Sequence, residues 1–382
     1  MEFTIKHIGD LCKMVCSGGT PSSMNPAYYD GGIPWLNTNE VSFCNIYSTN
    51  KTISEEGLKH SAAKYIPVNS VVVAMYGVTA GRSAITKVPL TTNQACCNLI
   101  IDEDKADYRY VYYFLKLQSD HLNKLANGGA QQNLNAKIIK KYKIPVPDLD
   151  VQHKIADILS SYDSLIENNT RRIRLLEKMT DTLYKEWFVR YRFSSHEKAV
   201  FENGLPKGWT RALLGSICPF VRGKNITADE MIPGCIPVIS AGITPSGTHN
   251  QSNVQGPSIT ISSSGANAGY ISFHYSDIWA ADCSYVSIRE TSHIFYAYEL
   301  LNNMRAVIDN LQRGAAQPHV YPKDINRVTI ILPDDIIRSV ANEKFKELHT
   351  LIFKLKQQNE ILIRQRDLLL PRLMSGRLEV IG

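Results

Sequence analysis

One short segment of the sequence has residue types that could hold a nucleic-acid base. Asn25, Pro26, Ala27 and Tyr28 form an Asn-Pro-x-Tyr run, and such a run can grip an extruded base by hydrogen bonding and stacking. That chemistry needs a strand before the run and a glycine-rich cofactor loop nearby. The preceding residues read GGTPSSM, and no such loop follows. We therefore expect a proline-aromatic turn and predict no catalytic residue.

Metal and nucleotide chemistry have equally little support. The eight cysteines include no C-x-x-C pair, and no histidine pair follows at zinc-finger spacing. No G-x-x-x-x-G-K-[ST] loop occurs, and the glycine-rich segments 77–81 and 263–265 flank strand-like sequence without a phosphate-binding helix start. We expect this chain to bind no metal and no cofactor of its own.

Composition suits a globular protein of two domains with a connecting structure. The chain has 382 residues, 44% hydrophobic residues and a net charge of +6. The basic surplus permits a nucleic-acid partner without requiring one. The opening residues lack a basic stretch followed by an apolar one, and no run of about 18 apolar residues occurs. We expect a cytoplasmic protein with reduced thiols.

The elements that would position a site form an internal repeat. Residues 128–132 read GGAQQ and residues 314–318 read GAAQP, an offset of 186 that Pro147 and Pro333 share. Upstream, the offset drifts as insertions require, so that GVTAGR (77–82) pairs with GANAGY (265–270). The chain is therefore expected to carry two copies of one module.

Each copy is expected to be an α+β domain dominated by strands and loops. Runs such as Ser70–Met75 and Ser258–Ser262 are rich in β-branched residues and flanked by turn residues. A helix with an aromatic face follows, over Tyr108–Leu125 and His293–Leu311, and a last strand leads to Pro145 or Pro333. The expected boundaries are 1–150 for the first domain, 151–195 for a first long helix, 196–333 for a linker and the second domain, and 334–382 for a second long helix.

The two long helices carry the clearest pattern, because seam positions recur every four and three residues and keep the 186 offset. The first series is Ile155, Leu159, Tyr162, Ile166, Asn169, Ile173, Leu176, Thr180, Leu183 and Trp187, and the second is Ala341, Phe345, Leu348, Ile352, Leu355, Asn359, Leu362, Arg366, Leu369 and Leu373. A 3.5-residue period requires a partner helix, so we expect the two to pair as an antiparallel coiled coil whose register the seam asparagines fix. The alternative is that each helix packs only on its own domain. Between the halves, Arg192–Lys207 has the polar, Gly- and Pro-containing sequence of a linker.

Several segments together resemble the specificity (S) subunits of type I restriction-modification enzymes, known as the HsdS family. They are GGTPSSMNPAYYDGGIPWLNTNEV (18–41), IPVPDLDVQHKIADILSSYDSLIEN (144–168), EKMTDTLYKEWFV (177–189) and RQRDLLLPRLMSG (364–376). The resemblance covers nearly the whole chain. The second copy departs from it in two places: ILPDDIIRSVANEKF lacks the Gln152-His153 step, so its helix is expected to start later or pack differently, and VRGKNIT replaces GGTP.

The resemblance implies that each module is a target recognition domain reading one half of a split, asymmetric DNA site. It also implies that two methyltransferase subunits dock on the helices and modify adenines with S-adenosylmethionine, and that restriction subunits using ATP and Mg can join. The chain itself would be non-catalytic. If the helices act as a ruler, the half-sites lie about one helical turn, or about 34 Å, apart.

Candidate DNA contacts are polar residues in the loops of each domain, since base edges need donors and acceptors and phosphates need cations. In the first domain they are Thr20, Ser22, Ser23, Asn37, Thr38, Asn39, Tyr76, Thr79, Arg82, Gln131 and Gln132. In the second they are Arg222, Lys224, Asn225, Ser240, Ser263, Ser264, Asn267, Tyr270, Arg313, Gln317 and His319. Lys137, Lys140, Lys141 and Lys143 form a basic cluster that would be either a phosphate clamp or a solvated strand edge.

Alternatives remain open at this level. Gln131 and Gln317 recur at one repeat position, which suits a buried structural role as well as a DNA contact. Tyr76 and Tyr270 could be core or rim aromatics, and Arg82 and Arg222 could be ordinary surface residues. Two other functions also fit in part: a coiled-coil scaffold whose domains bind protein rather than DNA, and a self-contained adenine methyltransferase, which the missing cofactor loop argues against.

Overall fold

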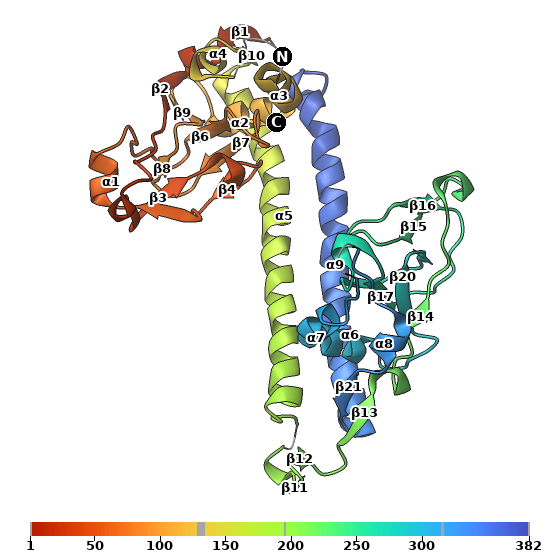
Figure 1. The fold of residues 1–382 in the computed structure, drawn as a ribbon. Helices are drawn as coiled ribbons and strands as arrows, with labels where there is room; N and C mark the ends of the chain where they lie inside the picture. Colours follow the sequence, from red (N-terminus) through yellow and green to blue (C-terminus); the bar gives the residue numbers. More distant parts are fainter. Residues whose placement is uncertain (1, 128–133, 195, 315–316, 381–382) are drawn as a thin grey trace. The chain divides into compact units, whose positions relative to one another are not determined.

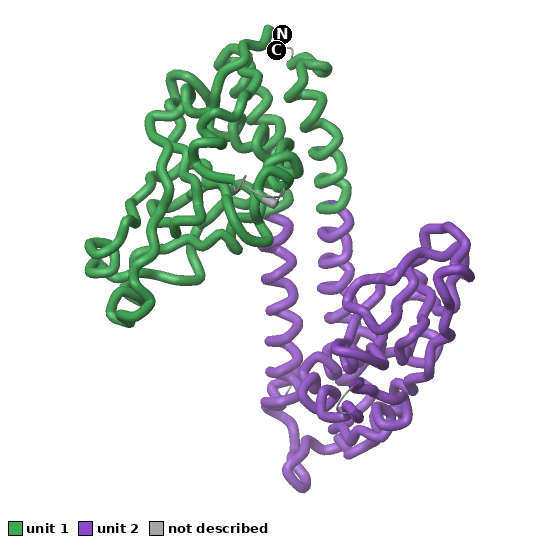
Figure 2. Tube along the Cα trace, turned by 45° about the horizontal axis from the view of Figure 1, so that its top comes forward, with its two compact units in different colours: residues 1–167, 359–382 green, residues 168–358 purple. Residues whose placement is uncertain are grey.

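The computed structural model describes residues 2–127, 134–194, 196–314 and 317–380. The chain divides into two compact units: residues 1–167 with 359–382 form unit 1, and residues 168–358 form unit 2 (Figure 2). No helix within the described ranges is long and apolar enough to span a bilayer.

Unit 1 contains three sheets built from short strands (Figure 1). The largest has the order β2-β9-β6-β7-β4, and its central strands are buried on both faces, as their apolar sequences require. A three-stranded sheet has the order β5-β3-β8, and β1 pairs with β10. The bounds are β1 Thr4–His7, β2 Cys12–Ser17, β3 Tyr29–Leu36, β4 Asn45–Ile46, β5 Lys51–Ile53, β6 Val71–Ala74, β7 Ser83–Thr86, β8 Thr91–Thr92, β9 Cys96–Ile101 and β10 Lys143–Val146.

Unit 2 repeats this plan. Its four-stranded sheet has the order β14-β20-β17-β18, its three-stranded sheet β16-β15-β19, and β13 pairs with β21. The bounds are β13 Thr210–Leu213, β14 Val221–Arg222, β15 Ile236–Ile239, β16 Gly247–His249, β17 Ser258–Ser262, β18 Ile271–His274, β19 Trp279–Ala280, β20 Cys283–Ser287 and β21 Thr329–Leu332. Even the pairing directions match: β3 and β15 each have one antiparallel and one parallel neighbour. The predicted repeat and fold class are therefore confirmed.

The predicted aromatic helices exist, but each is divided in two. Unit 1 has α1 Glu55–Lys59, α2 Tyr108–Leu117, α3 Ser119–Asn127 and α4 Ala136–Lys140, and unit 2 has α6 Ile294–Asn303, α7 Arg305–Asp309 and α8 Pro322–Asn326. The breaks fall at Gln118 and Met304, where the backbone N–H groups also bond to carbonyls only two or three residues earlier and so tighten the turn. The apolar pattern continues through both breaks, so it could not reveal them.

Two long helices, α5 Leu149–Tyr184 and α9 Asp335–Met374, follow the two domains. Both begin two residues after Pro147 or Pro333, so the expected later start of the second helix is wrong. The side-chain Oδ1 of Asn342 accepts hydrogen bonds from the backbone N–H groups of Phe295 and Tyr296, which anchors α9 to its own domain. Gln152 has the same role in unit 1, where its Oε1 accepts from the backbone of Asp107.

The two helices pair antiparallel within each unit, as predicted. In unit 1, Asp163 of α5 forms an ion pair with Arg366 of α9. In unit 2, Asn169 of α5 bonds to Gln358 of α9, and the later residue Ile173 packs with the earlier residue Leu355. Advancing along one helix therefore means going back along the other, which is the pattern of an antiparallel pair.

The linker is more structured than its sequence suggests. After α5 the backbone makes a wide helical turn over Lys185–Val189, which buries Trp187 and Phe188 against the second domain's core. A hairpin follows, formed by β11 Phe201–Glu202 and β12 Leu205–Pro206. Its two turn residues, Asn203 and Gly204, both have positive φ, which is the geometry of a tight hairpin turn.

Candidate nucleic-acid interface

Four loops of unit 1 are joined by side-chain hydrogen bonds into one polar surface. Thr20 bonds to Gln94, and the neighbouring Asn93 donates to Oδ1 of Asn37 at 3.2 Å. The hydroxyl of Thr79 donates to the carbonyl of Thr38 at 2.5 Å. Arg82 donates to Ser42 at 2.8 Å, with its guanidinium 5.9 Å from the ring centre of Phe43. The structure thus brings Thr20, Asn37, Thr38 and Arg82 of the predicted set together.

The loop between β6 and β7 depends on two glycines. Gly77 and Gly81 have φ of +81° and +84°, a backbone region that residues other than glycine rarely adopt. Their counterparts in unit 2, Gly265 and Gly269, have φ of +74° and +87°. The two turns therefore share left-handed glycines at both ends, and the alignment of GVTAGR with GANAGY matches residues 76, 79 and 82 of unit 1 with residues 264, 267 and 270 of unit 2.

The equivalent surface of unit 2 has different side chains. Asp282 accepts hydrogen bonds from both Arg222 and Ser264, so strand β14 and two loops meet at one carboxylate. The backbone of Ser264 also pairs with that of His319 in an isolated bridge. Arg305 lies over the ring of Tyr270, 5.6 Å from its centre. Unit 2 therefore presents cations and an acid where unit 1 presents mostly hydroxyl and amide groups.

Most predicted contact residues lie at the surface, but not all. The exposed side chains include Thr20, Ser22, Asn39, Tyr76, Arg82, Arg222, Lys224, Arg313 and Gln317. The half-buried ones include Asn37, Thr38, Asn267 and Tyr270. The prediction that Ser263 contacts DNA is wrong, because its side chain is fully buried and cannot reach a base edge. Thr79 is also buried, holding the neighbouring loop. Gln131 and Gln132 lie outside the described residues.

The predicted lysine cluster spans a short helix and the start of a strand, and its cations are exposed. Lys137 and Lys140 belong to α4, and Lys143 begins β10. At the 186 offset, Lys137 and Lys141 correspond to Lys323 and Arg327 beside α8. All four side chains are exposed, and none forms an ion pair with an acid among the described residues. Both units therefore carry the same pair of exposed cations.

Sequence reasoning missed three contributors to these surfaces. Gln94 and Asp282 link loops distant in sequence, and only tertiary structure shows that they meet. Arg327 could have been found by applying the 186 offset to Lys141. It lines an open pocket with Arg313, whose guanidinium lies 2.8 Å from Oδ1 of Asp324.

All positions of the predicted helix seam are buried or half-buried. The first two of each series also belong to the core of the preceding domain, so both packing modes operate. The seam asparagines are hydrogen-bonded: Asn169 donates to Gln358 at 3.1 Å, and Asn359 donates to the carbonyl of Ile166 at 3.5 Å. A buried amide with a partner in only one register favours that register.

The described part of the chain has no candidate metal cluster. No three His, Cys, Asp or Glu side chains gather there in an arrangement that could hold a metal ion. Burial raises the pKa of Cys96 to about 12 and that of Cys97 further, so neither is a thiolate at neutral pH. Asn25 caps a short turn by accepting from the backbone of Ala27, which is the structural use predicted for that segment.

Comparison with known proteins identifies the family. A family model described as type I restriction modification DNA specificity domain matches residues 1–178 and again residues 206–365. The type I restriction enzyme MjaIX specificity subunit of Methanocaldococcus jannaschii is 27% identical over 410 residues, covering 99% of this chain and 94% of that protein. The EcoR124I/EcoR124II specificity subunit of Escherichia coli is 30% identical over 187 residues, 46% of each protein.

The fold agrees with this family. The crystal structure of the S subunit of a type I restriction-modification system from M. genitalium superposes with a TM-score of 0.70 at 19% identity, covering 100% of this chain and 97% of that one. The chain belongs to the type I restriction-modification DNA specificity family.

Proposed function

We propose that this chain is the DNA specificity subunit of a type I restriction-modification complex, in which each unit reads one half of a bipartite, asymmetric site. The observation that carries the proposal is the pair of matching loop surfaces, each held on a rigid turn and each lined by exposed polar side chains. Reading base edges requires such donors and acceptors on a preorganised framework.

The two half-sites should differ, because equivalent positions carry different chemistry. Arg82 of unit 1 stands where unit 2 has Tyr270, and Tyr76 stands where unit 2 has Ser264. An arginine can grip guanine through two hydrogen bonds, whereas a tyrosine offers one hydroxyl and a ring. Two modules with one fold but different side chains would read different words.

The cations beside α4 and α8 would contact the DNA backbone. Lys137, Lys141, Lys323 and Arg327 are exposed and occur at the same two positions in both units. The phosphate backbone has the same charge at any sequence, so contacts to it need not change when the recognised word changes. Their repetition, next to loops that differ, supports this assignment.

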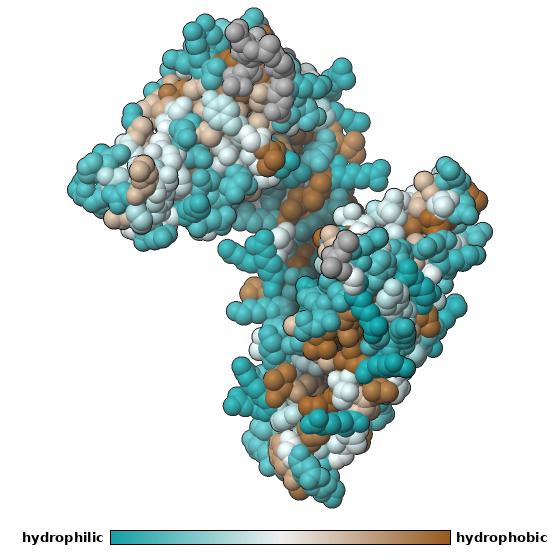
Figure 3. Space-filling view, viewed as in Figure 1, coloured by the Kyte–Doolittle hydropathy of each residue, from teal (hydrophilic) through white to brown (hydrophobic). Residues whose placement is uncertain are grey.

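The helices would carry the partner subunits. Hydrophilic residues cover most of the visible surface, with apolar ones in small groups (Figure 3). Two exposed apolar positions recur at the 186 offset: Leu165 matches Leu351, and Leu175 matches Ile361, all between 37% and 57% exposed. Each unit thus has one such residue on α5 and one on α9. A repeated apolar surface suits two copies of one partner, and we assign it to two methyltransferase subunits, with restriction subunits able to join.

The chemistry would be supplied by those partners. S-adenosylmethionine for methylation and ATP with Mg for restriction would bind to them, and this chain would be a non-catalytic component acting in the cytoplasm. Its contribution is to place the partners at a chosen DNA sequence.

Co-expression with the methyltransferase subunit of a type I system tests the proposal. Mapping modified adenines across the host genome should reveal one split, asymmetric motif. Replacing residues 1–147 with the corresponding domain of a relative should change one half of that motif and leave the other unchanged. A change in both halves would refute modular reading. If the unaltered protein showed no salt-dependent binding to DNA, a protein-binding scaffold would be favoured instead.

A further inference from the structure

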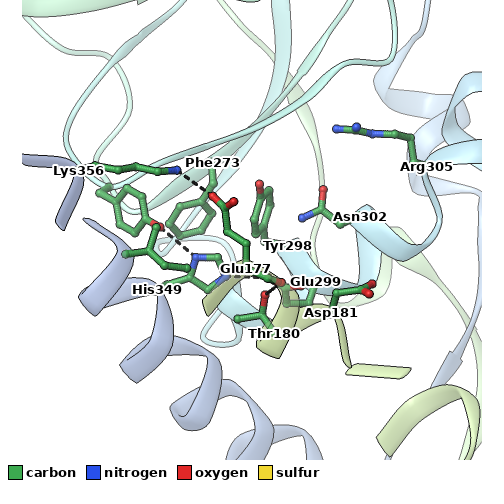
Figure 4. Close-up of a pocket in the computed structure, with 12 residues that line it drawn as sticks. Glu177, Thr180, Asp181, Phe273, Tyr298, Glu299, Asn302, Arg305, His349 and Lys356 are labelled. Carbon is green, nitrogen blue, oxygen red and sulfur yellow. Dashed lines mark hydrogen bonds and ion pairs between the residues drawn. The ribbon is translucent and has the colours of Figure 1, made fainter. Parts of the chain in front are cut away.

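The aromatic helix of each domain meets the helix pair at one repeat position. Tyr113 on α2 and Glu299 on α6 are 186 residues apart, and so are their partners, Asp163 on α5 and His349 on α9. In unit 1 the hydroxyl of Tyr113 donates to Oδ2 of Asp163 at 2.7 Å. In unit 2 Nε2 of His349 lies 2.7 Å from Oε1 of Glu299, and both line the pocket shown in Figure 4.

The unit 2 pair is almost fully buried among aromatic rings. The side chains of Glu299 and His349 are only 4% and 6% exposed. Aromatic rings surround the imidazole, including those of Phe273 at 5.3 Å and Tyr298 at 5.4 Å between ring centres. The hydroxyl of Tyr275 lies 3.0 Å from its Nδ1. A second carboxylate placed here would be largely shielded from water. Of the two cations that line the pocket, Arg305 and Lys356, the second is already paired with Glu177 at 3.2 Å.

The unit 1 pair is built from different groups. Burial raises the pKa of Tyr113 well above its ordinary range. Its hydroxyl therefore stays protonated and acts as the hydrogen-bond donor to Asp163. The carboxylate of Asp163 is 23% exposed and also forms an ion pair with Arg366 of α9. At the 186 offset, unit 2 has Thr180 in place of this arginine.

Each pair therefore holds one carboxylate, but from opposite sides of the boundary between domain and helix. In unit 1 the helix supplies it through Asp163, and in unit 2 the domain supplies it through Glu299. Seating the second domain on the first helix would bring Glu299 against Asp163, two carboxylates at hydrogen-bond distance. We propose that this position is a matching key that ties each recognition domain to the helix following it, so that domain and helix form one exchangeable cassette.

The key can be tested in the full chain by crossing the pairs one residue at a time. Tyr113→Glu and His349→Asp each create a Glu–Asp contact, in unit 1 and unit 2 respectively. Each has a matched rescue: Asp163→His added to the first recreates the unit 2 pair, and Glu299→Tyr added to the second recreates the unit 1 pair. Tyr113→Phe removes only the hydroxyl, and Tyr65→Glu, at a side chain 49% exposed, controls for the added charge.

Thermal unfolding of the full chain gives the readout. We expect His349→Asp to lower the unfolding temperature of its unit by about 10 °C, because the new carboxylate is fully buried, and Tyr113→Glu by about 5 °C, because Asp163 is partly exposed. Each rescue should recover at least about half of that loss. Tyr65→Glu should shift it by no more than about 2 °C. Tyr113→Phe should lower it by less than Tyr113→Glu does, because it removes a hydrogen bond but adds no buried charge.

Two results would overturn the key. One is a double variant no more stable than its crossed single variant, which would show that the two residues are not coupled. The other comes from a chimera in which residues 206–333 replace residues 1–147. The key requires that chimera to unfold at a higher temperature with Asp163→His than with the native Asp163, and equal temperatures would contradict it. Neither measurement involves DNA, so failure here is separate from failure of the proposed function.

Discussion

Removing the repeated cations tests how this protein holds DNA. The change is Lys137→Gln with Lys141→Gln in unit 1, and independently Lys323→Gln with Arg327→Gln in unit 2. All four side chains are exposed, and none has an acidic partner among the described residues, so their loss should cost little stability. If each contacts one phosphate, each releases about 0.9 counterion on binding.

The expected magnitude follows from that number. Each double variant should reduce the slope of log affinity against log salt concentration by about 1.8. Between 50 and 200 mM salt, the unaltered protein should therefore lose about 12-fold more affinity than either variant does. Because the two pairs occupy equivalent positions, the two variants should change the slope by the same amount.

Fluorescence anisotropy with a labelled duplex, measured at several salt concentrations on the chain with the proposed methyltransferase partner, gives the slope directly. Lys198→Gln with Lys207→Gln is the matched control, because it removes the same charge from exposed side chains of the linker. An unchanged slope in the α4 or α8 variants would refute the assignment. So would an equal change in the linker control, since that would reveal only a general effect of net charge.

Three other predictions concern the framework. Ile352→Ala should destabilise unit 2 by about 2–5 kcal/mol in chemical unfolding, because Ile352 is 1% exposed in the seam. Leu351→Ala, at the adjacent exposed position, should cost under about 1 kcal/mol. Similar losses for the two variants would contradict the seam. Asn169→Leu should leave unit 2 as stable or more so but allow other helix pairings, seen as higher oligomers by light scattering, and a strictly unchanged oligomeric state would argue against a role in register. Burial lowers the pKa of His274 from 6.5 to about 4. Between those pH values the unfolded chain binds more protons than the folded one, so the free energy of unfolding should fall by up to about 3 kcal/mol as pH drops from 6.5 to 4. His274→Gln should remove that pH dependence.

The sequence predicted the helices and strands whose pattern can be read from neighbouring residues. The 3.5-residue period of the long helices survives in the structure because each seam position packs at every turn, as Ile352 and Leu355 do against Ile173. Strand β17 coincides with the predicted run Ser258–Ser262 because its β-branched residues lie in the centre of a sheet. Such patterns require only nearby residues to be read correctly.

What the sequence could not predict depends on contacts between distant segments. Ser263 has the composition of a loop, yet the segment ending at Val320 covers it, with the backbone N–H of Val320 bonded to the carbonyl of Ser263. Asp282 joins Arg222 of β14 to the loop of Ser264, residues 60 and 18 positions away. No local pattern encodes such meetings, so the loop residues could be nominated from sequence but not assembled into a surface.

The differences between the two units indicate which positions are free to vary. The turn glycines keep their left-handed backbone in both units, and Lys137 and Lys323 both keep their charge. Our assignment of these cations to the phosphate backbone requires this, since that backbone is the same for any DNA sequence. Positions such as Arg82 and Tyr270 match in the alignment but differ in side chain. It follows that Arg82→Ala should alter which sequence is modified while leaving the salt dependence of binding to unrelated duplexes nearly unchanged. Lys137→Gln should do the reverse, lowering affinity for every duplex alike. If instead the lysine substitution changed the modified motif and the arginine substitution did not, the division between reading and holding DNA would be wrong.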